Sequence, residues 1–227
     1  MAREGSSNGA TSSARARRAT GGGRRSGSEE RPRLSRGEQT KVSIAEAMIT
    51  VIEGGNPKPT AQQVADQAGV SLRLVFHHFE DLESVFTVAA AVQQERHWAR
   101  LGSVPPDRPI DARIAATCRR RRRLFEAITP VRHAAVLRSP RSTTVSALLA
   151  EGRRQLRAEL AATFAPELDR LGAQRSIVLD AIDLAASWEN WFILRARDGR
   201  SAATAERVAR HSLNALLRGS ADRDTAW

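Results

Sequence analysis

The sequence predicts an all-α fold, and three features of its 227 residues support that prediction. From Gly37 onward, apolar residues recur at three- and four-residue steps, which is the pattern of helices with one buried face. No stretch alternates apolar and polar residues with a period of two, so we expect no sheet. Glycine and proline pairs such as Gly54-Gly55 and Pro105-Pro106 interrupt the helical pattern and predict turns between the helices.

Residues 1–36 are predicted to form a disordered basic arm. They consist largely of Ser, Gly, Ala and Arg, with too little apolar surface to offset the entropy cost of ordering. Nine arginines stand against three glutamates in this stretch. Such an arm can reach DNA phosphates or the minor groove, and the alternative is a solubilising tail without specific contacts.

Three short helices are predicted within residues 37–80. The first has one apolar face and ends at Gly54-Gly55. The second begins after Thr60, because Thr60 and Gln63 have the spacing of a capping box. Gly69 suits a left-handed turn, and Ser71 can cap the third helix. Two short helices joined in this way have the spacing of a helix-turn-helix, whose second helix enters the major groove of DNA.

Longer helices are predicted over residues 81–218, followed by a tail over residues 219–227. The first begins near Leu82, and the second carries the stripe from Ile114 to Ile128 and ends at Pro130. The third is expected to start at Ser139-Pro140 and to continue to Pro166. A last pair spans roughly residues 175–197 and 202–217.

Composition limits the classes of function. The net charge of +11 indicates a polyanionic partner, although a GC-rich coding sequence also explains the arginine content. The single cysteine, Cys118, excludes an internal disulfide and a multi-thiolate metal site. No apolar run approaches the roughly 20 residues that span a bilayer. We expect a cytoplasmic protein with no membrane association, no metal and no cofactor.

The stretch TAQQVADQAGVSLRLVFHHFEDLESV, from Thr60 to Val85, closely resembles the DNA-binding head of the TetR family of regulators. The resemblance implies a three-helix head followed by a helical domain that binds a ligand and dimerises. Two positions depart from the family pattern: Phe76 stands where tyrosine is common, and Leu82 where lysine is common. These changes remove a phosphate-contacting hydroxyl and a positive charge, and they predict a shift of contacts.

Candidate DNA contacts fall into two groups. The phosphate candidates are Lys41, Thr60, Ser71 and His78. The base-edge candidates are Gln62, Leu72, Arg73 and His77, of which Arg73 can form two hydrogen bonds to a guanine. The alternative for each residue is an exposed side chain that makes no direct contact.

The C-terminal domain contains candidates for an effector site. The stripe between Cys118 and Phe125 places Arg121 or Arg122 towards the interior, where a carboxylate of Asp180, Asp183 or Glu189, or an anionic ligand, would pair with it. The favoured alternative is that both arginines extend along the helix edge into water. The tentative ligand-binding set is His97, Cys118, Arg121, Arg122, Phe125, His133 and Trp188, each with a plain structural role as the alternative.

The last two helices are predicted to form a homodimer interface. The helix after residue 175 is apolar around most of its circumference, so we expect it to be buried on two sides. The interface candidates are Leu184, Trp188, Trp191, Val208, Leu213 and Leu216. A dimer places two recognition helices roughly 34 Å apart, or a multiple of that distance, to read a palindrome.

The resemblance implies a sequence-specific DNA-binding transcriptional regulator. The expected form is a homodimeric repressor that a small-molecule effector releases from a palindromic operator on double-stranded DNA. The alternative is a non-specific DNA-coating or helical adaptor protein that retains the head. No nucleophile elbow, Gly-rich phosphate loop or acid–base pair occurs, so we propose no catalytic residues and expect no enzyme.

Overall fold

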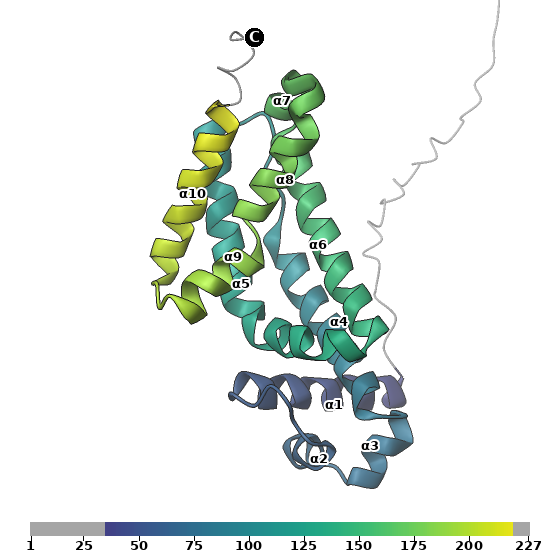
Figure 1. The fold of residues 1–227 in the computed structure, drawn as a ribbon. Helices are drawn as coiled ribbons and strands as arrows, with labels where there is room; N and C mark the ends of the chain where they lie inside the picture. The colour runs from purple at the N-terminus through teal and green to yellow at the C-terminus, as the bar shows by residue number, and fades with distance from the viewer. Residues whose placement is uncertain (1–34, 220–227) are drawn as a thin grey trace, which may run out of the picture. The chain divides into compact units, whose positions relative to one another are not determined.

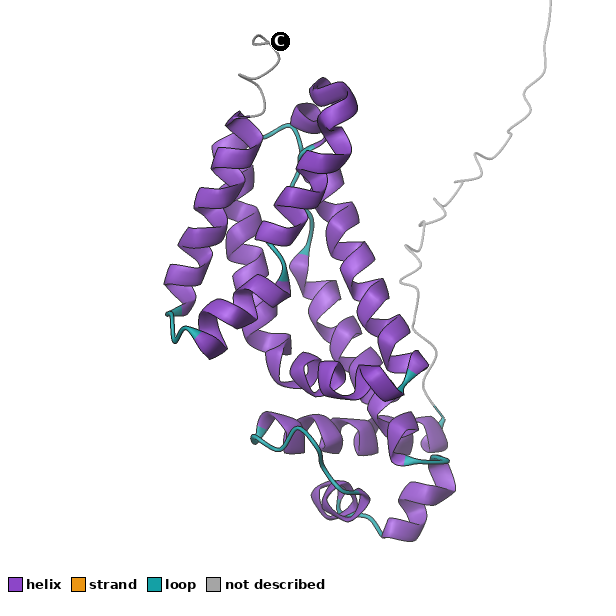
Figure 2. Cartoon of the chain, viewed as in Figure 1, coloured by secondary structure: helices purple, strands orange, loops and turns teal. Residues whose placement is uncertain are grey.

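The computed structural model describes residues 35–219, apart from the side chains of residues 99–101. Every regular element in that range is helical, which confirms the predicted all-α class (Figure 2). The helices are α1 (Arg36–Glu53), α2 (Ala61–Ala68), α3 (Leu72–His78), α4 (Leu82–Leu101), α5 (Ile110–Arg138), α6 (Thr143–Thr163), α7 (Ala165–Leu168), α8 (Arg175–Ala185), α9 (Trp188–Phe192) and α10 (Ala202–Gly219) (Figure 1). The predicted arm up to residue 34 and the predicted tail beyond residue 219 lie outside the described residues.

Helix α1 begins at Arg36, one residue earlier than predicted, because Ser35 caps it. The Glu38 amide donates to Ser35 Oγ at 3.3 Å, and the Ser35 amide donates to the Glu38 carboxylate at 2.7 Å. The capping box at Thr60 and Gln63 is confirmed in the same way, since each residue accepts from the other's amide. These local hydrogen bonds satisfy amides that have no partner inside the helix.

The first apolar core joins α1–α4 to the end of α5 and the start of α6. Its members from the first four helices include Ile44, Met48, Val64, Val75 and Phe86, all fully buried. Val131, Ala134 and Ala135 of α5 and Val145 of α6 complete it. The first four helices therefore share one core with α5 and α6, and α1 and α4 are the helices that pack against them.

Helix α5 does not end at Pro130, as the sequence predicted, but continues to Arg138. A proline inside a helix removes one hydrogen bond and usually bends the axis. Figure 1 shows the last part of α5 running across the direction of its first part. The helix continues because the turns after Pro130 bury Val131, Ala134 and Ala135 in the first core, and this packing outweighs the cost of the proline.

The remaining helices also differ from the predicted bounds. Residues 139–141 form a 3₁₀ turn, and α6 starts after Ser142, whose hydroxyl accepts from the Val145 amide at 3.1 Å. Helix α6 ends at Thr163, before Pro166. The long helix predicted over residues 175–197 is divided after Ala185, because Ser187 caps a new helix by accepting from the Asn190 amide at 3.2 Å.

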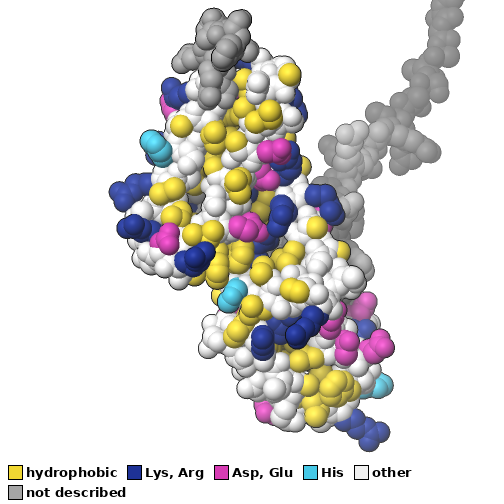
Figure 3. Space-filling model, viewed as in Figure 1, with side chains coloured by type: hydrophobic (Ala, Val, Ile, Leu, Met, Phe, Trp, Pro, Cys, Tyr) yellow, Lys and Arg dark blue, Asp and Glu magenta, His cyan; other side chains and the backbone are white. Residues whose placement is uncertain are grey.

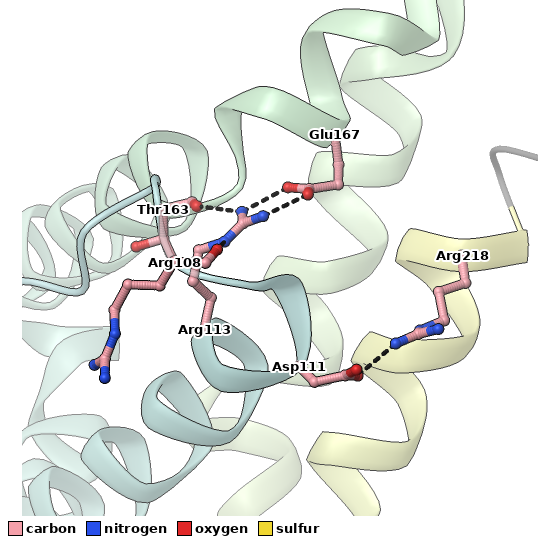
Figure 4. A network of polar contacts seen from close by, with 6 residues as sticks. All are labelled: Arg108, Asp111, Arg113, Thr163, Glu167 and Arg218. Carbon is pink, nitrogen blue, oxygen red and sulfur yellow. Dashed lines mark hydrogen bonds and ion pairs between the residues drawn. The ribbon is translucent and has the colours of Figure 1, made fainter.

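A buried arginine fixes the N-terminal end of α5 (Figure 4). Arg113 Nη1 donates to the Thr163 carbonyl oxygen at 2.9 Å and to a Glu167 oxygen at 2.6 Å, while its Nε donates to the Arg108 carbonyl oxygen at 2.7 Å. Because this guanidinium is fully partnered, its charge is tolerated in the interior. The network ties α5 to the end of α6 and to α7.

Candidate nucleic-acid interface and effector cavities

Helices α2 and α3 form the predicted helix-turn-helix. Gly69 has φ +67°, the left-handed conformation that favours glycine, and the Val70 amide donates back to the Ala65 carbonyl oxygen at 3.0 Å. Val64, Ala65 and Val75 are fully buried and hold the two helices together. The turn and its apolar contacts therefore leave one side of α3 facing outward.

The outward side of α3 carries three of the predicted DNA contacts together with Phe76. Leu72, Arg73, Phe76 and His77 are exposed, and Figure 3 shows hydrophobic side chains at the surface over α3. Arg73 makes no side-chain hydrogen bond or ion pair with any described residue, so its guanidinium is available to an external acceptor. His78 is half-buried and its ring lies 5.1 Å from that of His77.

The other predicted contacts are exposed but partly engaged. The Thr60 hydroxyl lies within hydrogen-bond distance of both the Gln63 amide and the Gln63 side chain. Gln62 Nε2 donates to Asp66 at 2.7 Å. Ser71 Oγ accepts from the Leu74 amide at 3.2 Å, which leaves its own proton to donate. Lys41, on α1, lies with its Nζ 6.0 Å from the centre of the Phe79 ring.

The predicted ligand-binding residues do not converge on one cavity. His97 lines a cavity of about 80 Å³ between α4, α5 and α6. Cys118, Arg121, Arg122 and Phe125 line a second one of about 630 Å³, formed by α5, α8, α9 and α10. Trp188 lines a third of about 200 Å³, which Arg121 also reaches. His133 lies outside all three, with its ring 5.0 Å from the Phe192 ring.

Arg121 is the arginine that points inward, so the expectation that it reaches water is wrong. Its side chain is buried, and it donates to the carbonyl oxygens of Leu156 at 2.6 Å and Ala186 at 3.3 Å. Burial lowers the pKa of its guanidinium because the charged form loses hydration. The suggested carboxylates bond other arginines: Asp180 and Asp183 pair with Arg157. Backbone carbonyls supply its hydrogen-bond acceptors, while Glu159 and the predicted Asp183 act on it through charge without a hydrogen bond.

Arg122 behaves as the alternative predicted. Its side chain is partly exposed and lies within ion-pair distance of Glu126, at 3.5 Å, and of Glu206, at 3.3 Å. Glu189 pairs with Arg132 and Arg153, each at 3.2 Å.

The dimer-interface candidates divide into exposed and buried residues. Leu184 is 64% exposed on α8 and Val208 is 42% exposed on α10, and Leu216 is half-buried beside them. Trp188, Trp191 and Leu213 are buried within the single chain, where they contribute to its core. Ile177 adds a further exposed apolar side chain on α8. Figure 3 shows hydrophobic side chains gathered between α8 and α10.

Sequence reasoning missed two polar residues in the smallest cavity, Gln93 and Arg132. Gln93 follows Phe86 and Ala89 at helical spacing on α4, so its place on a buried stripe is visible in the sequence. Arg132 follows the proline at which the helix was predicted to end, and its burial depends on the continuation of α5.

Comparisons with known proteins identify the fold. No protein-family model matches the chain, and no curated protein matches it in sequence. A TetR-family regulator from Streptomyces coelicolor superposes with a TM-score of 0.63 at 20% identity, over 83% of this chain and 84% of that one. A proposed TetR-family regulator from Mesorhizobium loti MAFF303099 gives 0.62 at 19% identity, over 82% and 98%. A transcriptional regulator from Rhodococcus sp. Rha1 gives 0.58 at 19% identity, over 82% and 97%.

Among the described residues, no helix is both long and apolar enough to cross a membrane, and no group of His, Cys, Asp and Glu is arranged to hold a metal ion. The structural likeness extends over both the helix-turn-helix and the C-terminal helices, because it covers more than four fifths of the chain. The chain therefore has the all-α fold of TetR-family transcriptional regulators.

Proposed function

We propose that the protein is a sequence-specific DNA-binding transcriptional regulator of the cytoplasm. One observation carries the proposal: α3 is held by buried apolar residues on one side and presents Arg73, His77 and the Ser71 hydroxyl on the other. This is the arrangement by which a recognition helix reads base edges while its neighbours hold the phosphates. We assign residues 37–80 to the DNA-binding head and residues 81–218 to effector binding and dimerisation.

The protein acts in this proposal as a homodimeric repressor. The exposed apolar side chains of α8 and α10 support a second copy on that face, since large apolar patches on a monomer mark interaction sites. A small molecule in the C-terminal helices would favour a spacing of the two heads that no longer fits the operator. Effector and operator must then weaken each other's binding by the same factor.

The test is selection of bound fragments from random duplex DNA with the full chain, at about 150 mM salt. We expect enrichment of a palindromic site that is bound at least about 10³-fold more tightly than random DNA. Binding that weakens with salt but enriches no sequence would reject the proposal in favour of a DNA-coating or adaptor protein. The variant Arg73→Ala tests readout by α3, and Arg123→Ala, at an exposed position on α5, is its control.

A further inference from the structure

The cavity between α4, α5 and α6 is small and mainly apolar. Its walls include Phe86 on α4, Leu124, Ile128 and Val131 on α5, and Leu148 and Leu149 on α6. Its volume of about 80 Å³ is about half that of an engineered cavity of about 150 Å³ that binds benzene. A ligand with a compact hydrocarbon part of a few carbon atoms fits this space.

Two residues that line the cavity each have a buried nitrogen atom with no hydrogen-bond partner among the described residues. Gln93 is 4% exposed, and its Nε2 is one of them. Arg132 Nε is the other. Buried donors are almost always paired in folded proteins, because an unpaired one has lost its hydration without replacement. Two such donors beside one cavity indicate that an acceptor belongs there.

The charge around the cavity indicates that the acceptor is anionic. No aspartate or glutamate is among its lining residues, whereas Arg132 is. The Arg132 guanidinium stacks over the Trp188 ring at 5.0 Å and shares Glu189 with Arg153. Burial penalises its charged form and lowers its pKa. An anionic oxygen beside Nε would relieve that penalty and form a charge-assisted hydrogen bond.

Helix α6 passes close to this guanidinium. A Cβ atom on Gly152, which also lines the cavity, would meet Arg132 Nη1 at 4.0 Å, an ordinary van der Waals distance.

We infer that this cavity binds a small apolar carboxylate, whose oxygens accept hydrogen bonds from Gln93 Nε2 and Arg132 Nε. The inference rests on the proposed function, because it assigns the effector site and the chemical class of the effector. Phe86, Val131, Ala135 and Val145 line the cavity and also belong to the core that α1–α3 share. A ligand there contacts the side chains on which the DNA-binding helices pack.

The experiment titrates the full chain with isobutyrate and with two matched compounds, isobutyramide and isobutylamine, by calorimetry. Isobutyrate is expected to bind with a Kd of about 1 mM or tighter, and isobutyramide about tenfold more weakly, because it lacks the negative charge. Isobutylamine, which carries a positive charge, is expected not to bind. Equal binding of all three compounds, or no binding of isobutyrate at about 10 mM, overturns the inference.

Variants locate the site. Gln93→Leu removes the side-chain amide and Arg132→Met removes the guanidinium, each at similar volume, and both are expected to weaken isobutyrate binding about tenfold. The control is Arg153→Met, because Arg153 shares Glu189 but is largely exposed outside the cavity. Unchanged affinity in both cavity variants overturns the inference. If either variant fails to fold, the comparison of the three compounds on the unmodified chain still tests the inference.

A final arm separates this inference from the proposed function. The selected DNA site is titrated with the protein at saturating isobutyrate, and its affinity is expected to fall at least fivefold. If the protein binds DNA specifically but isobutyrate does not change that affinity, the inference is overturned and the proposed function still stands. Absence of specific DNA binding, with isobutyrate still bound, rejects the proposed function and not the cavity's ligand class.

Discussion

Arg138 Nη1, at the end of α5, donates a hydrogen bond to the main-chain carbonyl oxygen of Pro57 at 2.7 Å. Pro57 lies in the turn between α1 and α2, so this bond joins the C-terminal helices to the turn that precedes the helix-turn-helix. The same guanidinium stacks over the Phe86 ring at 4.4 Å, and Phe86 lines the cavity between α4, α5 and α6. A displacement of Phe86 would therefore move the Arg138 guanidinium, which donates to the α1–α2 turn.

Arg138→Met is expected to lower the free energy of unfolding by about 1 kcal/mol. Methionine keeps contact with Phe86 but cannot donate to Pro57, and hydrogen bonds from charged groups contribute about 1.5–3 kcal/mol when buried. The bond here is partly exposed, which reduces its contribution. Urea denaturation measures the change. The control is Arg141→Met at a nearby exposed position, and equal losses in the two variants would contradict the role of the bond.

Arg73→Ala is expected to relax base preference at one position in each half of the palindrome. Arg73 is exposed on α3, and an arginine that forms two hydrogen bonds to guanine contributes about 1–3 kcal/mol of discrimination. Repeating the fragment selection with the variant shows which position loses its preference. Arg123→Ala, at an exposed position on α5, should leave the selected sequence unchanged. A uniform loss at every position would instead make Arg73 a phosphate contact.

Phe76→Tyr is expected to tighten DNA binding roughly threefold to tenfold. The Phe76 side chain is 49% exposed on the outward side of α3, where a hydroxyl can reach a phosphate without disturbing the core. Tyrosine adds a donor but no charge, so the salt dependence of binding should not change. Fluorescence anisotropy at several salt concentrations measures both quantities, and a steeper salt dependence would argue against this explanation.

Stability is expected to fall above about pH 9 because of Cys118. Burial raises the pKa of its thiol from 9.0 to about 12. Between these values the unfolded chain loses the proton and the folded chain keeps it, so stability that is complete below pH 9 declines by roughly 1.4 kcal/mol per pH unit. The stability advantage of the wild type over Cys118→Ala should shrink by about 1 kcal/mol between pH 9 and pH 10 in urea unfolding, because the unfolded thiol is already half ionised at pH 9. A constant difference would show that the thiol ionises in the folded protein.

Leu184→Asp is expected to convert the proposed dimer to a monomer. Leu184 and Val208 are exposed apolar residues beside the cavity of about 630 Å³ formed by α5 and α8–α10. A carboxylate buried at an interface without a partner is costly, whereas the same residue on a free surface is tolerated. Sedimentation velocity measures the mass. Val136→Asp, at an exposed position on α5, is the control, and an unchanged mass for Leu184→Asp would place the interface elsewhere.

Local chemistry in the sequence was sufficient for the elements of the head. Thr60 with Gln63, Gly69 and Ser71 act through hydrogen bonds and backbone angles within a few residues, so their roles as caps and turn are confirmed. The apolar stripes likewise identified the class of fold and the inward direction of Val75, because helical periodicity depends only on sequence spacing.

Tertiary packing decided the rest. Pro130 is a helix terminator by local rules, yet α5 continues because Val131, Ala134 and Ala135 join the first core, where α5 packs against α1 and α4, which lie far away in the chain. Periodicity alone also left open whether Arg121 reaches water, and carbonyl oxygens of α6 and of the residue after α8 settled it. The cavity beside Gln93 and Arg132 depends on three helices at once. The sequence by itself determined which segments are helical and how the turn at Gly69 is built; only the packing of distant helices decided where helices continue, which charges are buried and where the cavities lie.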